Sequence, residues 1–429
     1  MPIRPPFSSP SKAPLIRASE IPSPSVPPSA AALVTRRCFV RAVGCGAGGA
    51  VLASAGAFPR PARAVSEAAA PPSPSPLRIG YLPITDATPL LVAHGRGLFK
   101  AEGLTPERPV LLRSWPQVAE AFQARQVDVV HLLMPMAIWL RFGQNFPLKV
   151  VAWDHVDGSA LTVSPDVKTL DDLAGKTVAV PFWYSIHNVI LQQLLRNAKL
   201  RPVLKEAPSR DARTVKLVVM APPDMPPALS NGAIAGFIVA DPFNALAEIN
   251  HVGKILRFTG DVWQHHACCV VVMHQDDIDR RPGWAQSVVT ALAKAQVYAR
   301  DHRADVAKLL SKEDGGYLPQ PRAAIERALS HYDQTEYGGP AGAIRHPEWG
   351  GHRIDFQPFP FPSYTEKLIT LLKQTLVEGD TAFLQKLDPA QAHAALVDDR
   401  FARQAINAAG GPERLGLDAS WRRTEKLAP

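Results

Sequence analysis

Short apolar runs alternate with amphipathic stretches along most of this chain. The runs 77–81, 127–133 and 177–180 have the length and apolar character of buried strands. Each is followed by a stretch with apolar residues at helical spacing, for example 189–196. A strand–helix–strand rhythm of this kind predicts an α/β fold with mostly parallel sheets. Because ligands of such sheets bind beyond the carboxyl ends of the strands, the loops that follow the strands are the first candidates for a site.

The stretch 180–188, with the sequence VPFWYSIHN, is the most informative of these loops. It leaves a predicted strand and enters a predicted helix at Ser185 or Asn188, and it carries aromatic rings, a hydroxyl and His187. Unpaired backbone N–H groups at a helix start attract anions. The loop therefore predicts a ligand contact through His187, and an aromatic turn with a hydrogen-bonded core histidine is the alternative interpretation.

Polar or aromatic residues recur at the other strand-to-helix loops. The full set is Thr85, Asp86, Thr88, Trp115, His187, Asp241 and Asn244. Such a set suits binding of a small ligand without turnover, although Trp115 could be core, Asp241 a helix cap and Asn244 a surface residue. No nucleophile elbow, phosphate loop, zinc signature or pair of catalytic carboxylates stands at suitable spacing. We therefore expect a binding protein that is not an enzyme and uses no cofactor or metal.

Two lobes are expected from the length of 429 residues. A weak internal repeat supports this, because 121–129 and 228–237 each end a helix, turn and enter a buried strand. Hinge crossovers are expected near 161–164 and 267–271. The predicted organisation is a first lobe at 77–163 and 268–380, a second lobe at 164–267, and a C-terminal extension at 381–429 with a loose tail.

Residues 1–64 have the features of an export signal. Residues 35–41 read TRRCFVR, an uncharged Gly/Ala-rich stretch follows, and 62–64 form a small-x-small cleavage site. This resembles a twin-arginine (Tat) signal. The alternative is a membrane anchor, for which the apolar run is short and rich in glycine. With a Pro/Ser/Ala linker at 65–76, we expect a periplasmic or otherwise extracytoplasmic protein.

The net charge of +8 belongs to this leader, since residues 1–64 carry eight basic side chains and one acidic one. The remainder is nearly neutral, which argues against a nucleic-acid partner. Outside the leader the only cysteines are Cys268 and Cys269, so no disulfide framework is expected. They lie in the sequence HHACC with His265 and His266. Four such groups in five consecutive residues cannot all converge on one ion, and we predict no metal site there.

Seven segments, in order, resemble the nitrate- and bicarbonate-type substrate-binding proteins of bacterial ABC importers, within the nitrate/sulfonate/taurine superfamily. They are YLPITDATPLLVAHGRGLF, SWPQVAEAF, MPMAIWLRFG, VPFWYSIHN, ADPFNALA, DVWQHHACC and RIDFQPFPF, spread over about residues 77–364. The resemblance implies a two-lobed, type II-like periplasmic-binding-protein fold. It also implies a monomeric receptor that closes on a small oxyanion, nitrate or nitrite first, and delivers it to a transmembrane permease and its ATPase. By motif match it places Trp115 and His187 in the pocket, with Thr85, Asp241 and Asn244 near it.

Two departures from the family pattern concern the ligand. Residues 157–160 read DGSA where the family has an NGQA-like segment, which makes Ser159 a candidate contact. Residues 259–263 read TGDVW, without the lysine that nitrate binders place before a D-x-W segment. A buried anion needs charge or several donors, so cyanate, bicarbonate and aliphatic sulfonates stay open as ligands. Two other classes also stay open: a cytoplasmic nitrate sensor, which would lack a leader, and an enzyme like the thiamine-pyrimidine synthases, whose cysteine-rich iron motif Cys268 and Cys269 match only in part.

Overall fold

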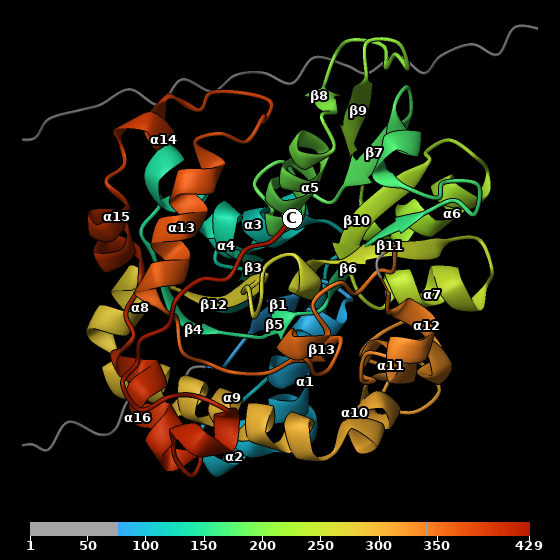
Figure 1. Cartoon of the computed structure of the whole chain (residues 1–429). Coiled ribbons are helices and arrows are strands. Elements are labelled where there is room, and N and C mark those ends of the chain that lie inside the picture. The colour runs from blue at the N-terminus through green and yellow to red at the C-terminus, as the bar shows by residue number, and fades with distance from the viewer. Residues whose placement is uncertain (1–75, 340) are drawn as a thin grey trace, which may run out of the picture. The chain divides into compact units, whose positions relative to one another are not determined.

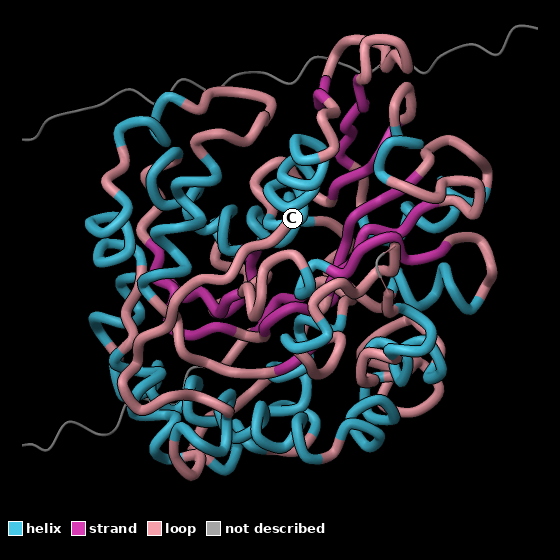
Figure 2. The backbone as a smooth tube through the Cα atoms, viewed as in Figure 1, coloured by secondary structure: helices cyan, strands magenta, loops and turns pink. Residues whose placement is uncertain are grey.

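The computed structural model describes residues 76–339 and 341–429, all within the unit Ala69–Pro429. The expected export signal and nearly all of the linker lie outside the described residues. Two separate groups of strands, each flanked by helices, organise this part of the chain (Figure 2). We call the regions built on them the first lobe and the second lobe.

The first lobe contains a five-stranded sheet in the order β2–β1–β3–β12–β4. β1 pairs in parallel with β2 and β3, while β12 lies antiparallel between β3 and β4. Successive side chains of β3 face opposite sides, so that Val129 joins a core with α1 and α9 and Val130 joins a core with α3. The bounds are β1 (Ile79–Tyr81), β2 (Val110–Leu111), β3 (Val129–Leu133), β4 (Leu148–Trp153), β12 (Cys269–His274), α1 (Thr88–Gly95), α3 (Trp115–Gln123) and α9 (Pro282–Asp301).

The second lobe contains a six-stranded sheet in the order β11–β6–β10–β7–β9–β8. Strands β10, β7, β9 and β8 are parallel, and β6 runs antiparallel to both of its neighbours, β10 and β11. The bounds are β6 (Ser159–Val163), β7 (Thr177–Val180), β8 (Arg201–Val203), β9 (Thr214–Val219), β10 (Gly236–Ala240), β11 (Lys254–Phe258), α5 (Ile186–Asn197), α6 (Met225–Ser230) and α7 (Phe243–Ile249). The predicted fold class, α/β with two mostly parallel sheets, is confirmed.

Two crossovers join the lobes (Figure 1). The chain leaves the first sheet after β4, passes through β5 (Val156–Asp157) and enters the second sheet at β6. It returns between β11 and β12 through a 3-10 turn, Thr259–Asp261. Residues 159–163, which we had placed at the end of the first lobe, therefore belong to the second sheet, because β6 pairs with β10 and β11.

Serine caps fix the starts of two helices that face the crossovers. The Ser114 hydroxyl accepts from the Gln117 N–H at the start of α3. The Ser185 hydroxyl accepts from the Asn188 N–H at 3.1 Å, so Ser185 begins α5. Thr88 is the first residue of α1 and donates its hydroxyl to the Thr85 carbonyl.

Helices after β12 cover the first lobe and the margin between the lobes. They are α8 (Gln275–Arg280), α10 (Arg303–Leu310), α11 (Arg322–Ala328), α12 (Gln334–Tyr337), α13 (Pro362–Leu372), α14 (Ala382–Lys386), α15 (Pro389–Leu396) and α16 (Arg400–Ala408), with α2 (Leu98–Ala101) and α4 (Met134–Ile138) earlier in the chain. Strand β13 (Ile354–Asp355) pairs with β5. Within the described ranges, no helix combines the length and the apolar character needed to cross a bilayer.

The C-terminal tail is not loose, contrary to our expectation. Glu425 accepts from the Trp263 indole N–H at 2.8 Å, the Ala428 N–H donates to the Val262 carbonyl at 2.8 Å, and Asn197 of α5 donates to the Pro429 carbonyl at 2.8 Å. Figure 1 shows the tail, in red, ending beside α5. Residues 421–429 thus lie along the return crossover and reach the second lobe.

Candidate functional site

A group of fully buried polar side chains lies at one edge of the first sheet, where it meets the second lobe. Asp86 follows β1, His155 follows β4, and Cys268 and Cys269 stand at the start of β12. Because β12 is antiparallel to its neighbours, its start lies at the same edge as the carboxyl ends of β3 and β4. We call Asp86, His155, Cys268 and Cys269 the first-lobe cluster.

The distances within the first-lobe cluster are short. Nε2 of His155 lies 2.9 Å from Oδ2 of Asp86, and the Cys269 thiol donates to the same oxygen at 3.3 Å. The sulfur atoms of Cys268 and Cys269 are 3.9 Å apart. One nitrogen, oxygen or sulfur atom from each of the four residues lies within 4.8 Å of every other.

The second lobe contributes Ser159 and His187 to this place. Ser159 is the first residue of β6 and His187 lies in the first turn of α5. Oγ of Ser159 is 2.9 Å from Nε2 of His187, and that nitrogen is 3.8 Å from Sγ of Cys268. Two of the predicted ligand residues are therefore brought together, against side chains of the opposite lobe.

Many buried polar atoms here have no hydrogen-bond partner among the described residues. They are Oδ1 of Asp86, Nε1 of Trp115, Nδ1 of His131, both carboxyl oxygens of Asp154, Nδ1 of His155, Nδ1 of His187 and both ring nitrogens of His266. Each such atom costs about 1–3 kcal/mol when buried without a partner. Buried polar atoms are normally hydrogen-bonded, so these atoms make the region between the lobes the candidate for a site.

Burial and neighbouring charges shift several pKa values in this region. Burial raises the pKa of Asp154 well above its usual range. Burial opposes protonation of His155, but the carboxylate of Asp86 outweighs it and raises the His155 pKa. Burial also opposes ionisation of Cys268, yet the hydrogen bond with Cys269 and the charge of His187 lower the Cys268 pKa. Burial likewise raises the pKa of Asp86, although the neighbouring His155 opposes this shift.

Trp115 lies beside this group, as the first residue of α3. It is buried, and its ring centroid is 5.5 Å from that of His131 in β3. Nε2 of His131 accepts from the Leu82 N–H at 2.8 Å, so the imidazole is fixed against the loop after β1. The free indole N–H of Trp115 is a hydrogen-bond donor without a protein acceptor.

The other three predicted residues have protein partners, and one bond among them joins the two lobes. The Thr85 hydroxyl donates to the Asp241 carbonyl at 2.9 Å. The Asp241 carboxylate accepts from the Ala245 N–H at 3.1 Å and faces Arg353 at 3.3 Å. Asn244 accepts from the Thr162 hydroxyl at 2.8 Å, within the second lobe. Since these polar side chains already have protein partners, a ligand contact by Thr85, Asp241 or Asn244 stays a prediction.

Sequence reasoning passed over His131, Asp154 and His155. The available signal was a polar residue inside or directly after a buried apolar run, as in VVHLL and LKVVAWDH. The residues of the sequence HHACC lie in two different places. His265 is partly exposed and lies 3.3 Å from Asp157. Cys268 and Cys269 instead face Asp86 and His155. The adjacent histidines do not converge with the cysteines, as expected, but distant residues do.

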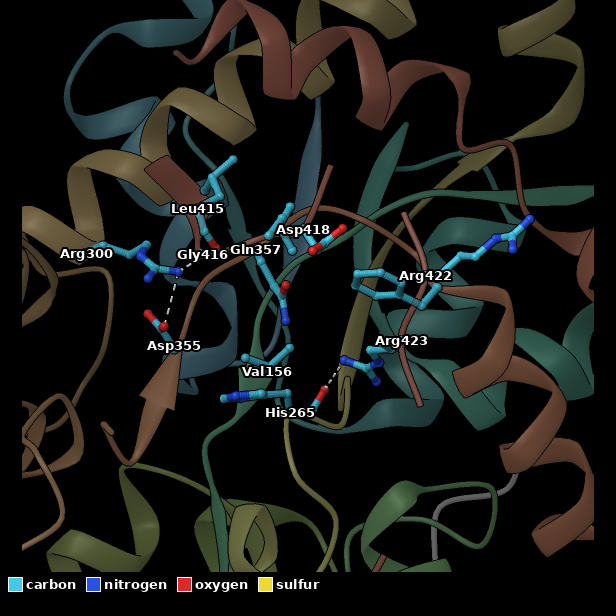
Figure 3. Close-up of a pocket in the computed structure, with 12 residues that line it drawn as sticks. Val156, His265, Arg300, Asp355, Gln357, Leu415, Gly416, Asp418, Arg422 and Arg423 are labelled. Carbon is cyan, nitrogen blue, oxygen red and sulfur yellow. Dashed lines mark hydrogen bonds and ion pairs between the residues drawn. The ribbon is translucent and has the colours of Figure 1, made fainter. Parts of the chain in front are cut away.

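A cavity of about 370 Å³ lies at the surface of the first lobe, between the tail and residues 300 and 355–357 (Figure 3). Two of its arginines have protein partners. Arg300 pairs with Asp355 at 3.2 Å, and Arg423 donates to the His265 carbonyl at 3.0 Å and pairs with Glu425. Because these cations are already neutralised or hydrogen-bonded, the interlobe group is the stronger candidate for a ligand site.

Comparison with known proteins gives both a family and a fold. The model of the NMT1-like family matches residues 70–311. The chain is 29% identical over 272 residues to the nitrate import ATP-binding protein NrtC of Synechocystis sp., covering 61% of this chain and 40% of that protein. It is 26% identical over 298 residues to the nitrate/nitrite binding protein NrtA of Nostoc sp., covering 64% of this chain and 65% of that protein. The chain thus spans about two fifths and just under two thirds of the lengths of these relatives.

Among solved structures, the periplasmic nitrate-binding protein NrtA from Synechocystis PCC 6803 superposes with a TM-score of 0.67 at 18% identity, covering 82% of this chain and 94% of that one. At this identity the likeness concerns the fold, which is that of the two-lobed periplasmic binding proteins.

Proposed function

Since this chain belongs to the NMT1-like family, we propose that it is the substrate-binding component of an ABC importer and captures a small oxyanion between its lobes. The observation that carries the proposal is the meeting of Ser159 and His187 with the first lobe, beside buried polar atoms that lack partners. Nitrate or nitrite is the first candidate, with cyanate, bicarbonate and aliphatic sulfonates as alternatives. The partners are a transmembrane permease and its ATPase, and the receptor works as a monomer.

Hydrogen-bond donors supply the chemistry of such a site. An anion withdrawn from water needs a cation or several donors around it. The indole N–H of Trp115 and the hydroxyl of Ser159 are neutral donors. His187 donates from Nδ1 or from Nε2, depending on its tautomer. The residues named at this site include no lysine or arginine, which favours a weakly hydrated anion over a strongly charged one.

Capture and release follow from the two crossovers. Rotation about the segments 156–158 and 259–268 would separate Ser159 and His187 from the first lobe and admit the anion. Closure would surround the anion with buried groups and present a closed receptor to the permease. In such a rotation β6 and α5 would move together as one rigid body, and β1 and β12 would form part of the other.

Isothermal titration calorimetry of the purified protein tests the ligand class. Nitrate, nitrite, cyanate, bicarbonate and methanesulfonate are titrated separately, with chloride as the control for ionic strength. Saturable binding of one oxyanion at one site per chain is expected. Absence of heat and of any thermal shift with all five would overturn the proposal.

Export is tested separately by cell fractionation. We propose that residues 35–41 direct the protein through the Tat pathway, because they carry the paired arginines Arg36 and Arg37 ahead of an uncharged stretch. The unaltered protein is expected in the periplasmic fraction, and the Arg36→Lys/Arg37→Lys variant in the cytoplasm. Cytoplasmic retention of the unaltered protein would instead support a sensor.

A further inference from the structure

We propose that the first-lobe cluster, Asp86, His155, Cys268 and Cys269, binds one thiophilic divalent transition-metal ion of the Zn²⁺ class. The four side chains come from three separate segments of the chain and converge at the edge of one sheet. All four are completely buried. All four side chains belong to the first lobe and its crossovers, so the ion needs no ligand from the second lobe, although the cluster borders the place proposed for the anion.

The spacing of the donor atoms matches four-coordinate geometry. Two thiolates at about 2.3 Å from a tetrahedral zinc ion are about 3.8 Å apart, and the sulfur atoms of Cys268 and Cys269 are 3.9 Å apart. Nitrogen and oxygen ligands of such an ion are separated by about 3.3 Å. The 2.9 Å between His155 and Asp86 is shorter, so this pair would open by less than half an ångström, roughly.

The hydrogen bonds around Nε2 of His155 cannot all form in one protonation state. Nε2 of His155 faces both the Cys269 N–H, a donor at 3.2 Å, and Oδ2 of Asp86, an acceptor at 2.9 Å. One ring nitrogen cannot accept the first bond and donate the second in the same protonation state. A cation would account for the short distance between Nε2 and Oδ2, since each of these two atoms then offers a lone pair to it.

Buried carboxyl oxygens without partners are a second feature that a cation would explain. Oδ1 of Asp86 and both oxygens of the neighbouring Asp154 have no partner among the described residues. Carboxylates buried without a cation or donor are costly. A bound dication would neutralise Asp86 directly and stabilise the thiolates of Cys268 and Cys269.

The donor set selects the kind of metal. Two sulfur ligands with one imidazole disfavour Mg²⁺ and Ca²⁺, which take oxygen ligands, and favour zinc-like ions in tetrahedral geometry. The second lobe would close over the ion, because Nε2 of His187 is 3.8 Å from Sγ of Cys268.

The test uses Co²⁺ as a spectroscopic probe of the chelator-treated protein. Cys38 and Cys45 in the leader are first replaced by serine, so that Cys268 and Cys269 are the only thiols in the 429-residue chain. One equivalent of Co²⁺ is expected to produce tetrahedral d–d bands and a sulfur-to-cobalt charge-transfer band, both abolished by one equivalent of Zn²⁺. Absence of these bands, or bands of octahedral oxygen coordination, would overturn the proposal even without further variants.

Variants then locate the site. Cys269→Ser and Asp86→Asn are expected to weaken Co²⁺ binding at least about tenfold, and Cys268→Ser to halve the charge-transfer intensity. Asp128→Asn, at a buried carboxylate outside the cluster, is the matched control and should bind Co²⁺ as the parent does. Unchanged binding in natively folded cluster variants would place the metal elsewhere. Nitrate titration of the metal-free protein reports on the proposed function alone, so the two proposals can fail separately.

Discussion

Replacement of His187 by alanine separates a ligand contact from a structural role. His187 lies in the first turn of α5 and is 1% exposed, yet its one close polar contact with a side chain of its own lobe is Ser159, at 2.9 Å. Its other ring nitrogen, Nδ1, has no partner among the described residues. The hydrogen bonds of this imidazole therefore contribute little to the unliganded fold, in which the ring acts mainly through packing.

The magnitudes follow from these contacts. Loss of the Ser159 bond should lower the free energy of unfolding by about 0.5–1.5 kcal/mol. Loss of a hydrogen bond to a charged ligand costs about 1.5–3 kcal/mol, which corresponds to a rise in Kd of roughly 10- to 150-fold. His187→Ala should therefore weaken anion binding far more than it destabilises the protein.

Leu191→Ala provides the matched control in the same helix. Leu191 is fully buried in the apolar core, and its truncation should cost about 2–5 kcal/mol of stability while Kd changes little. Urea unfolding of the ligand-free variants gives the stabilities, and calorimetry with the anion that binds the parent gives Kd. A stability loss in His187→Ala equal to that in Leu191→Ala, or an unchanged Kd, would refute the assignment of His187 to the ligand.

Three further predictions concern the contacts that hold the lobes in place. Arg353→Met should lower the free energy of unfolding by about 3–5 kcal/mol, because Arg353 is 1% exposed and pairs with Asp241 and Glu248; urea unfolding measures it. Burial opposes ionisation of Glu248, but its bond to Arg327 and the charge of Arg353 lower the Glu248 pKa, so its stabilisation is present above about pH 4.3 and is lost as the pH falls further. Glu248→Gln should therefore lose less stability on acidification than the parent. Ser185→Ala should cost about 1 kcal/mol by uncapping α5, again by urea unfolding.

Each of these predictions has its own control. Arg280, whose side chain is 78% exposed, is the control for Arg353: Arg280→Met should change the free energy of unfolding by no more than about 0.5 kcal/mol. If Arg353→Met caused an equally small loss, the ion pairs of Arg353 would not stabilise the protein. For Glu248, the same stability difference from the parent at pH 7 and at low pH would contradict the pKa argument. Ser185→Gly should cost only a few tenths of a kcal/mol, and a larger loss than in Ser185→Ala would show that capping is not the reason.

Local patterns were enough to predict the strands and helices whose apolar residues face a core. Strands β3 and β7 and the helix start at Ser185 follow directly from apolar runs and a capping serine. Strand β11, with the sequence KILRF, was missed because Arg257 makes it look exposed, whereas that side chain is 2% exposed and pairs with Asp261. Asp261 lies outside β11, so the sequence of the strand alone does not reveal this ion pair.

The candidate site shows the same limit more strongly. Ser159 and His187 could be named from their loops, but the first-lobe cluster depends on register and crossing of strands. Asp86 and Cys269 are separated by 183 positions and meet only because β12 returns into the first sheet antiparallel to β3. Periodicity predicts which residues are buried, not which buried polar groups face each other.

If the protein binds an anion as proposed, the C-terminal tail would give residues far from that anion an influence on its affinity. Its bonds to Val262, Trp263 and Asn197 join the return crossover to the second lobe in the arrangement described. Each bond contributes about 0.5–1.5 kcal/mol net, and any bond that exists only in the closed conformation raises the closed population by the corresponding Boltzmann factor. Since apparent affinity scales with the fraction of binding-competent molecules, the tail would act as a built-in allosteric bias. Receptors that share the same pocket but differ in this segment would then retain their ligands for different times.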